Sequence, residues 1–194
     1  MNIVKKLALG LAFAASFSAT AFASVVQTSS GGSYYGYQAW GSHEIGKVTF
    51  ATGTNTISAL TTSVDLQDQG WGGQCDCNQV YIALFDTEDK EVWAQHVAGA
   101  VHGWTNQVFD ISTDLVAFDK LNAAMGALDY STGGIASVKM FASPVGWGGW
   151  SLEVQNAGMS IASDAVSVPE PASLALLGLG LLGLTASRRK FGQK

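Results

Sequence analysis

Hydrophobic and polar residues alternate along much of the chain between residues 24 and 166. In the clearest case, the apolar residues Trp150, Leu152 and Val154 are separated by single polar residues. Successive side chains of a strand point to opposite faces, so this period of two predicts a strand with one buried face. Comparable runs, bounded by Gly, Asp, Asn and Ser, occur at residues 47–51, 56–66, 79–85, 92–98, 107–111 and 135–142.

Short strands at this spacing predict an all-β domain. Residues 86–90 lie between two of the runs and are typical of a hairpin loop. Only residues 114–125 have the apolar spacing of a helix. The pattern therefore favours a single β-sandwich of jelly-roll type over a barrel, with the domain spanning residues 24–166.

The first 23 residues have the organisation of a signal peptide. Lys5 and Lys6 precede an uncharged, mostly apolar run, and the small residues Ala21 and Ala23 stand just before Ser24. We therefore expect signal peptidase to cleave before Ser24 and the following domain to be exported. The alternative is a buried N-terminal helix, but no polar face recurs there at helical spacing.

Residues 167–194 contain a second membrane signal. An uncharged stretch rich in Leu and Gly covers residues 172–187. At about 1.5 Å per residue this helix is slightly short for a hydrocarbon core of about 30 Å, so flanking arginines must reach the headgroups. Basic residues after the stretch predict a transmembrane helix with a cytoplasmic C-terminus. The motif before the helix is Pro169, Glu170 and Pro171, and the basic residues after it are Arg188, Arg189 and Lys190.

This order of Pro-Glu-Pro motif, short apolar helix and basic tail resembles the PEP-CTERM sorting signal of exopolysaccharide-producing Gram-negative bacteria. The resemblance implies that exosortase, a membrane protease or transpeptidase, recognises and processes the region around Pro169, Glu170 and Pro171. The precursor would be anchored in the inner membrane, and the processed protein would reach the cell surface or the medium. An ordinary C-terminal membrane anchor is the alternative, and it also places the domain outside the cytoplasm.

The central domain is strongly acidic. Of fifteen acidic residues only Glu170 lies in the terminal signals, whereas six of ten basic residues do, which leaves 14 acids against four lysines and a net charge of about −10. This charge argues against binding of nucleic acid or anionic lipid, because both require a basic surface. Neutral sugars, cations and other proteins remain as partners, and the acidity alone can also serve solubility.

Acids, glycines and both cysteines of the chain fall together in residues 65–78. The oxidising compartment favours a disulfide, and Cys75 and Cys77 form the only intramolecular pair, although a bond two residues apart requires a local bend. Intermolecular disulfides and a two-thiolate metal site are the alternatives.

The same loop offers oxygen ligands of the kind that calcium prefers, on Asp65, Asp68 and Asp76. Their spacing does not match a calcium-binding loop, so they are weak calcium candidates. The alternative is that they are solvated loop acids.

Tryptophans on glycine-rich loops suggest a sugar-binding site. The string Gly-Trp-Gly-Gly occurs at residues 70–73 and 146–149. Indole faces stack on sugar rings while polar side chains bind the hydroxyls, although tryptophan is also a routine core residue. The candidate ligand-binding residues are Trp71, Trp147, Asp68, Asp76 and Asn78.

Catalytic motifs are scarce in this sequence. Its three histidines, His43, His96 and His102, form no metalloprotease motif, and there is no Gly-x-Ser-x-Gly elbow. We therefore expect a non-enzymatic surface or matrix protein whose sandwich binds exopolysaccharide and needs no cofactor beyond the calcium just considered. A purely structural or adhesive subunit is the main alternative, and a hydrolase acting on polysaccharide is a third.

Overall fold

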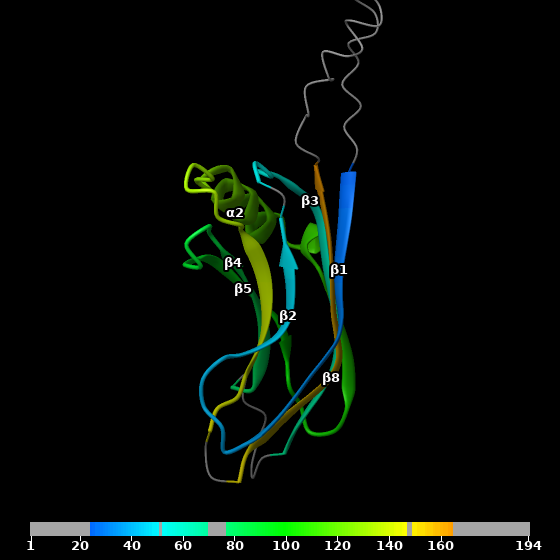
Figure 1. Cartoon of the computed structure of the whole chain (residues 1–194). Coiled ribbons are helices and arrows are strands. Elements are labelled where there is room, and N and C mark those ends of the chain that lie inside the picture. Colours follow the sequence, from blue (N-terminus) through cyan, green and yellow to red (C-terminus); the bar gives the residue numbers. More distant parts are fainter. Residues whose placement is uncertain (1–23, 51, 70–76, 147–148, 165–194) are drawn as a thin grey trace, which may run out of the picture. The chain divides into compact units, whose positions relative to one another are not determined.

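The structure, a computed structural model, describes residues 24–50, 52–69, 77–146 and 149–164 (Figure 1). All of them belong to one compact unit, Ser24–Val166. Its elements are β1 Ser24–Tyr37, β2 His43–Thr49, β3 Ile57–Gln69, β4 Gln79–Phe85, β5 Glu91–Gly99, β6 Thr105–Asp110, the 3₁₀ turn Ile111–Thr113, α2 Leu115–Gly126, β7 Ser137–Ser143 and β8 Ser151–Asp164.

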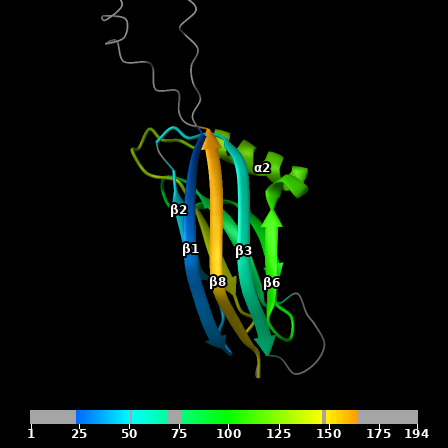
Figure 2. The same cartoon turned by 90° about the vertical axis from the view of Figure 1, so that its right-hand side faces the viewer.

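The strands form two antiparallel four-stranded sheets. One has the order β1-β8-β3-β6 and the other the order β2-β7-β4-β5. Figure 2 shows the first sheet, with β8 between β1 and β3. The predicted all-β, sandwich-like fold is confirmed.

The core lies between the two sheets and is made by the apolar positions of the alternating pattern. On β8, Leu152 and Val154 are almost fully buried, and Leu66 of β3 and Ile82 of β4 are not exposed at all. Period-two alternation thus gives each sheet an apolar inner face, as predicted. The outer face of the first sheet is polar, whereas that of the second carries the stacked rings of Tyr81 and Phe141.

The predicted hairpin and helix are both present. Antiparallel strands β4 and β5 are joined by residues 86–90, where the backbone N–H of Asp86 donates to the carbonyl of Lys90 at 2.9 Å. Asp114 caps α2 by accepting from the N–H of Ala117 at 3.0 Å. Asn122 of the helix exchanges two hydrogen bonds with the backbone of Ile57, which fastens α2 to the start of β3.

Strand β1 was not predicted. Its sequence is dominated by Ser, Gly and Tyr, and its pairing with β8 shifts register twice between Ser29 and Tyr34, so no simple alternation runs through it. Gly32 explains part of the irregularity, because a Cβ at this position would lie 2.0 Å from the carbonyl oxygen of Ile45. Only glycine allows β1 to approach β2 so closely across the edge of the sandwich.

The predicted signal peptide, residues 1–23, and the predicted sorting segment, residues 167–194, lie outside the described residues. The same holds for Pro169, Glu170, Pro171, Arg188, Arg189 and Lys190. Within the described ranges, no helix is both long and apolar enough to cross a membrane. The domain boundaries and the two flanking helices stay predictions.

Candidate functional site

The outer face of the β1-β8-β3-β6 sheet carries six amide and carboxylate side chains. We call this set the amide-carboxylate face: Asp65, Gln67, Asn106, Glu153, Gln155 and Asn156. Strand register explains why they meet, because Asp65 on β3 pairs with Asn106 on β6 and with Gln155 on β8, and Gln67 pairs with Glu153. Paired residues of antiparallel strands point to the same side, so side chains distant in sequence become neighbours.

Each carboxylate of this face is held by two amides. Asn106 donates to Oδ1 of Asp65 at 2.7 Å and Asn156 to Oδ2 at 2.8 Å. These hydrogen bonds, that of Asn156 first, lower the pKa of Asp65 below its ordinary value. Gln67 donates to Glu153 at 2.7 Å, and Gln155 approaches its other oxygen at 3.5 Å. The face is therefore pre-arranged, with donors and acceptors in fixed positions.

Three exposed aromatic residues lie at the end of β1 and in the connection from β1 to β2. We call Tyr35, Tyr37 and Trp40 the aromatic row; their exposed fractions are 65, 56 and 64%. Tyr35 pairs with Glu153, so this end of the row meets the amide-carboxylate face, whereas Trp40 pairs with Val145 in the β7–β8 connection. Large aromatic surfaces exposed beside hydrogen-bonding groups are suited to a ligand with one apolar face and many hydroxyls.

The backbone of the β7–β8 connection supports Trp40. A bridge pairs Trp40 with Val145, and a Cβ at Gly146 would lie 2.0 Å from Nε1 of the indole. The indole thus lies directly against the glycine backbone, whereas most of its surface stays open to solvent. Gly146 begins the second Gly-Trp-Gly-Gly string, and its role here is to make room for a tryptophan that lies elsewhere in the sequence.

The connection carrying Trp40 is braced on its other side. The rings of Tyr34 and His43 stack with centroids 4.6 Å apart, and Nε2 of His43 lies 3.3 Å from the carbonyl oxygen of Trp40. The aromatic row is therefore held on both flanks, which reduces the ordering cost of binding a ligand to it.

Two of the predicted ligand-binding residues are buried. Asp68 is 4% exposed, and its Oδ1 atom lies 2.8 Å from Nδ1 of His102. Asn78 is 1% exposed; its Oδ1 accepts from the N–H of Val145 at 2.8 Å, and its Nδ2 lies 3.4 Å from the carbonyl oxygen of Ser151. The structure thus turns both residues toward the protein, where they join strands and connections, and away from the exposed face described above.

Four further predicted candidates fall outside the described residues. These are Trp71, Trp147, Asp76 and Cys75. Cys77 is described and is disulfide-bonded; its pairing with Cys75 stays a prediction. Of the three calcium candidates, Asp65 uses both oxygens to accept from amides, and Asp68 faces His102. Within the described ranges no three His, Cys, Asp or Glu side chains are grouped so that they could hold a metal.

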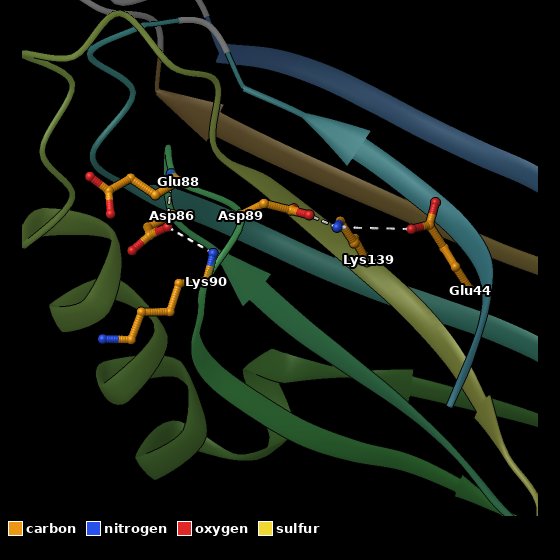
Figure 3. Close-up of polar contacts among 6 residues, drawn as sticks. All are labelled: Glu44, Asp86, Glu88, Asp89, Lys90 and Lys139. Atoms are coloured by element: carbon orange, nitrogen blue, oxygen red, sulfur yellow. Dashed lines mark hydrogen bonds and ion pairs between the residues drawn. The ribbon is translucent and has the colours of Figure 1, made fainter. Parts of the chain in front are cut away.

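Polar residues of the β4–β5 hairpin serve the local fold (Figure 3). Asp86 accepts from the N–H groups of Glu88 and Lys90, both at 2.9 Å. Lys139 of β7 contacts Asp89 at 2.5 Å and Glu44 at 4.0 Å, with its amine 4.1 Å from the ring centroid of Phe85. A cavity of about 390 Å³ lies beside this hairpin and the end of α2. Its Asp86 and Asp129 are both engaged in turns, Asp129 with the N–H of Ser131.

Sequence reasoning missed the aromatic row and all of the amide-carboxylate face except Asp65. A usable signal was present for part of it. Tyr35 and Tyr37 are two residues apart, as side chains on one face of a strand must be, and Gln67, Glu153 and Gln155 are the polar members of alternating runs. What the sequence lacks is the strand order that makes them neighbours.

Comparison with known families identifies the C-terminal segment. Residues 167–190 match the family of the PEP-CTERM protein-sorting motif. The predicted resemblance is confirmed, and the motif implies an exported protein that exosortase processes, with a C-terminal membrane anchor before processing. No curated protein matches the chain as a relative.

Solved structures with a similar arrangement include two from infectious bursal disease virus. The structure of the Gx strain gives a TM-score of 0.41 at 15% identity and covers 77% of this chain. The VP2 subviral particle gives a TM-score of 0.42 at 12% identity and covers 75% of this chain. The chain spans 33 and 34% of those two chains. A likeness of this size says nothing about function.

Proposed function

We propose that this protein is a non-enzymatic surface or extracellular-matrix protein whose sandwich binds polysaccharide. The observation that carries the proposal is Trp40, whose indole lies against the backbone of Gly146 and is still 64% exposed. Burying such an indole against a sugar ring is favourable, because about 25 cal/mol is gained per Å² of apolar surface removed from water. The amide-carboxylate face, which the aromatic row meets at Tyr35, supplies partners for hydroxyl groups.

The position of the aromatic row suits display on a surface. Ser24 at the start of β1 pairs with Asp164 at the end of β8. Figure 1 shows that the start of β1 and the end of β8 lie at the opposite end of the sandwich from the β1–β2 connection. Within the domain, the connection that carries the aromatic row is therefore at the far end from the last residues of β8, after which the sorting segment follows in sequence. We also class the sandwich as a jelly roll, which the strand orders β1-β8-β3-β6 and β2-β7-β4-β5 support.

The environment of Asp65 supports binding rather than hydrolysis. Hydrolysis of a glycosidic bond usually requires one carboxyl group whose pKa is raised, so that it can act as an acid. The hydrogen bonds to Asp65 lower its pKa instead. Release of reducing sugars from a polysaccharide by the purified protein would contradict the non-enzymatic proposal.

Affinity electrophoresis of the full-length chain in gels containing different polysaccharides tests binding. We expect at least one polymer to retard the wild type and Trp40→Ala to lose most of this retardation. Leu115→Ala is the matched control, because Leu115 is also exposed and apolar but belongs to α2, which Figure 1 shows at the opposite end of the sandwich from the β1–β2 connection. Equal mobility of the wild type in every gel would refute polysaccharide binding.

A purely structural subunit is the second candidate, favoured by the edge of the first sheet. Strand β1 is an edge strand of 14 residues without a single charged side chain. Exposed edges without charges pair readily with other strands. Light scattering under reducing and oxidising conditions distinguishes this candidate, which requires oligomers, from a monomeric polysaccharide-binding protein.

A further inference from the structure

Two rows of polar side chains cross the outer face of the β1-β8-β3-β6 sheet, with one residue per strand. The rows are Tyr35, Glu153 and Gln67, and Gln155, Asp65 and Asn106. Adjacent strands lie about 4.8 Å apart, so the two rows together span about 14 Å from β1 to β6. An elongated ligand lying across the strands can contact residues on all four strands. A single sugar is too short to contact all four.

The charge of this face is negative and is not compensated. Asp65 and Glu153 stand in the middle of the two rows. None of the sequences of β1, β3, β6 and β8 contains lysine or arginine. The lysines of the described ranges are Lys47, Lys90, Lys120 and Lys139, which lie on β2, in the β4–β5 hairpin, on α2 and on β7. An anionic ligand would therefore meet two carboxylates and no cation on these strands.

We propose that this face binds the interior of an uncharged polysaccharide chain laid across the strands and that it excludes polyanionic chains such as polyuronates. The inference rests on the proposed function and adds the charge class and the binding mode. Sugar hydroxyls donate to Asp65 and Glu153 and accept from the second N–H of the Gln67 and Gln155 amides, each of which uses one N–H for Glu153. Because hydrogen bonds keep the pKa of Asp65 low, its charge persists in mildly acidic solution and continues to repel anions.

A matched pair of polymers tests the charge selectivity. A panel of uncharged glucans, galactans and mannans first identifies a polymer that binds the full-length chain. The primary alcohols of that polymer are then oxidised to carboxylates, which gives a polyanion of the same linkage. We expect its affinity to be about ten-fold lower at low ionic strength and to recover partly at about 0.5 M NaCl, because salt screens exposed charges. Oligosaccharides of the uncharged polymer should compete for the face, and the corresponding monosaccharide should not.

Substitution at the face distinguishes local repulsion from the overall acidity of the protein. Glu153→Gln removes one carboxylate and keeps the size of the side chain. The ratio of the affinity for the uncharged polymer to the affinity for its oxidised form should therefore fall several-fold. Asp119→Asn makes the same change in net charge at an exposed position on α2 and should leave the ratio unchanged. Equal affinity of the wild type for both polymers, or an equal effect of the two substitutions, would overturn the inference and leave polysaccharide binding intact. Failure of every uncharged polymer to bind would overturn it together with the proposed function.

Discussion

Nδ1 of His102 lies 2.8 Å from Oδ1 of Asp68, which joins the end of β3 to the β5–β6 connection. The Asp68 side chain is 2% exposed and that of His102 is 45% exposed, so a buried acid meets a partner that still reaches solvent. The backbone N–H of Asp68 also donates to the carbonyl of Val101 at 3.0 Å. The contact therefore stabilises the Asp68 carboxylate, whose burial on the inner face of the sheet would otherwise destabilise the fold.

Removal of His102 should destabilise the fold. His102→Ala leaves the Asp68 carboxylate desolvated without this partner, and we expect a loss of about 1–3 kcal/mol in the free energy of unfolding. Urea unfolding at neutral pH measures the change. A double-mutant cycle with Asp68→Asn isolates the pair; a coupling energy near zero would contradict a direct interaction.

The side chain of Asn78 should be among the most sensitive polar groups of the described chain. It accepts from Val145 and approaches the carbonyl of Ser151, so it joins the start of β4 to the β7–β8 connection. Asn78→Ala leaves the half-buried N–H of Val145 without its acceptor and should cost about 1–3 kcal/mol. Asn55 is exposed, and Asn55→Ala is the control, expected to change stability by less than about 0.5 kcal/mol. Equal unfolding midpoints for the two variants would refute this role.

Acid should weaken the contact between Asp89 and Lys139. The hydrogen bond from Lys139 lowers the pKa of Asp89 below its ordinary value of 3.8. A lowered pKa contributes stability that is complete above the unfolded value and is lost as the pH falls from there through the folded value. Between about pH 5 and 2, the free energy of unfolding should therefore fall more steeply in the wild type than in Lys139→Met.

Lys120→Met is the control for this pH dependence. Lys120 is an exposed lysine on α2. The free energy of unfolding of Lys120→Met should therefore fall between about pH 5 and 2 with the same slope as that of the wild type. The same slope for all three proteins below about pH 4 would show that Asp89 gains nothing from Lys139.

The sequence was a good guide to elements whose side chains alternate without interruption. On β8, Leu152 and Val154 follow such a pattern, and the inner face of the strand follows from it. Strand β1 breaks the pattern because Gly31 and Gly32 lie at a register shift, where close approach to β2 matters more than side-chain burial. The approach of β1 to β2 depends on how closely the two backbones pack, and the sequence of β1 alone does not show this.

The candidate site depends on pairings that are distant in sequence. Asp65 is 41 residues from Asn106 and 91 residues from Asn156, yet it accepts from both. The sequence signalled polar outward positions on each strand separately. It could not show which strands are neighbours, and so it directed attention to the dense loop of residues 65–78, where Asp68 and Asn78 are in fact buried.

Gly146 provides the sharpest test of the aromatic row, because a methyl group there would occupy the space of the Trp40 indole. A Cβ would lie 2.0–2.2 Å from three indole atoms, so Gly146→Ala must displace Trp40. The backbone of Gly146 has φ +37°, which adds a cost that any non-glycine residue would meet.

Gly133→Ala separates the steric effect from the backbone effect, since Gly133 has φ +75° and nothing within 4 Å of its Cβ position. We expect both variants to lose about 1 kcal/mol of stability from the backbone term. Only Gly146→Ala should also change tryptophan fluorescence and lose most polysaccharide retardation. If it kept wild-type retardation while the fluorescence showed that Trp40 had moved, the indole platform would not be the binding surface.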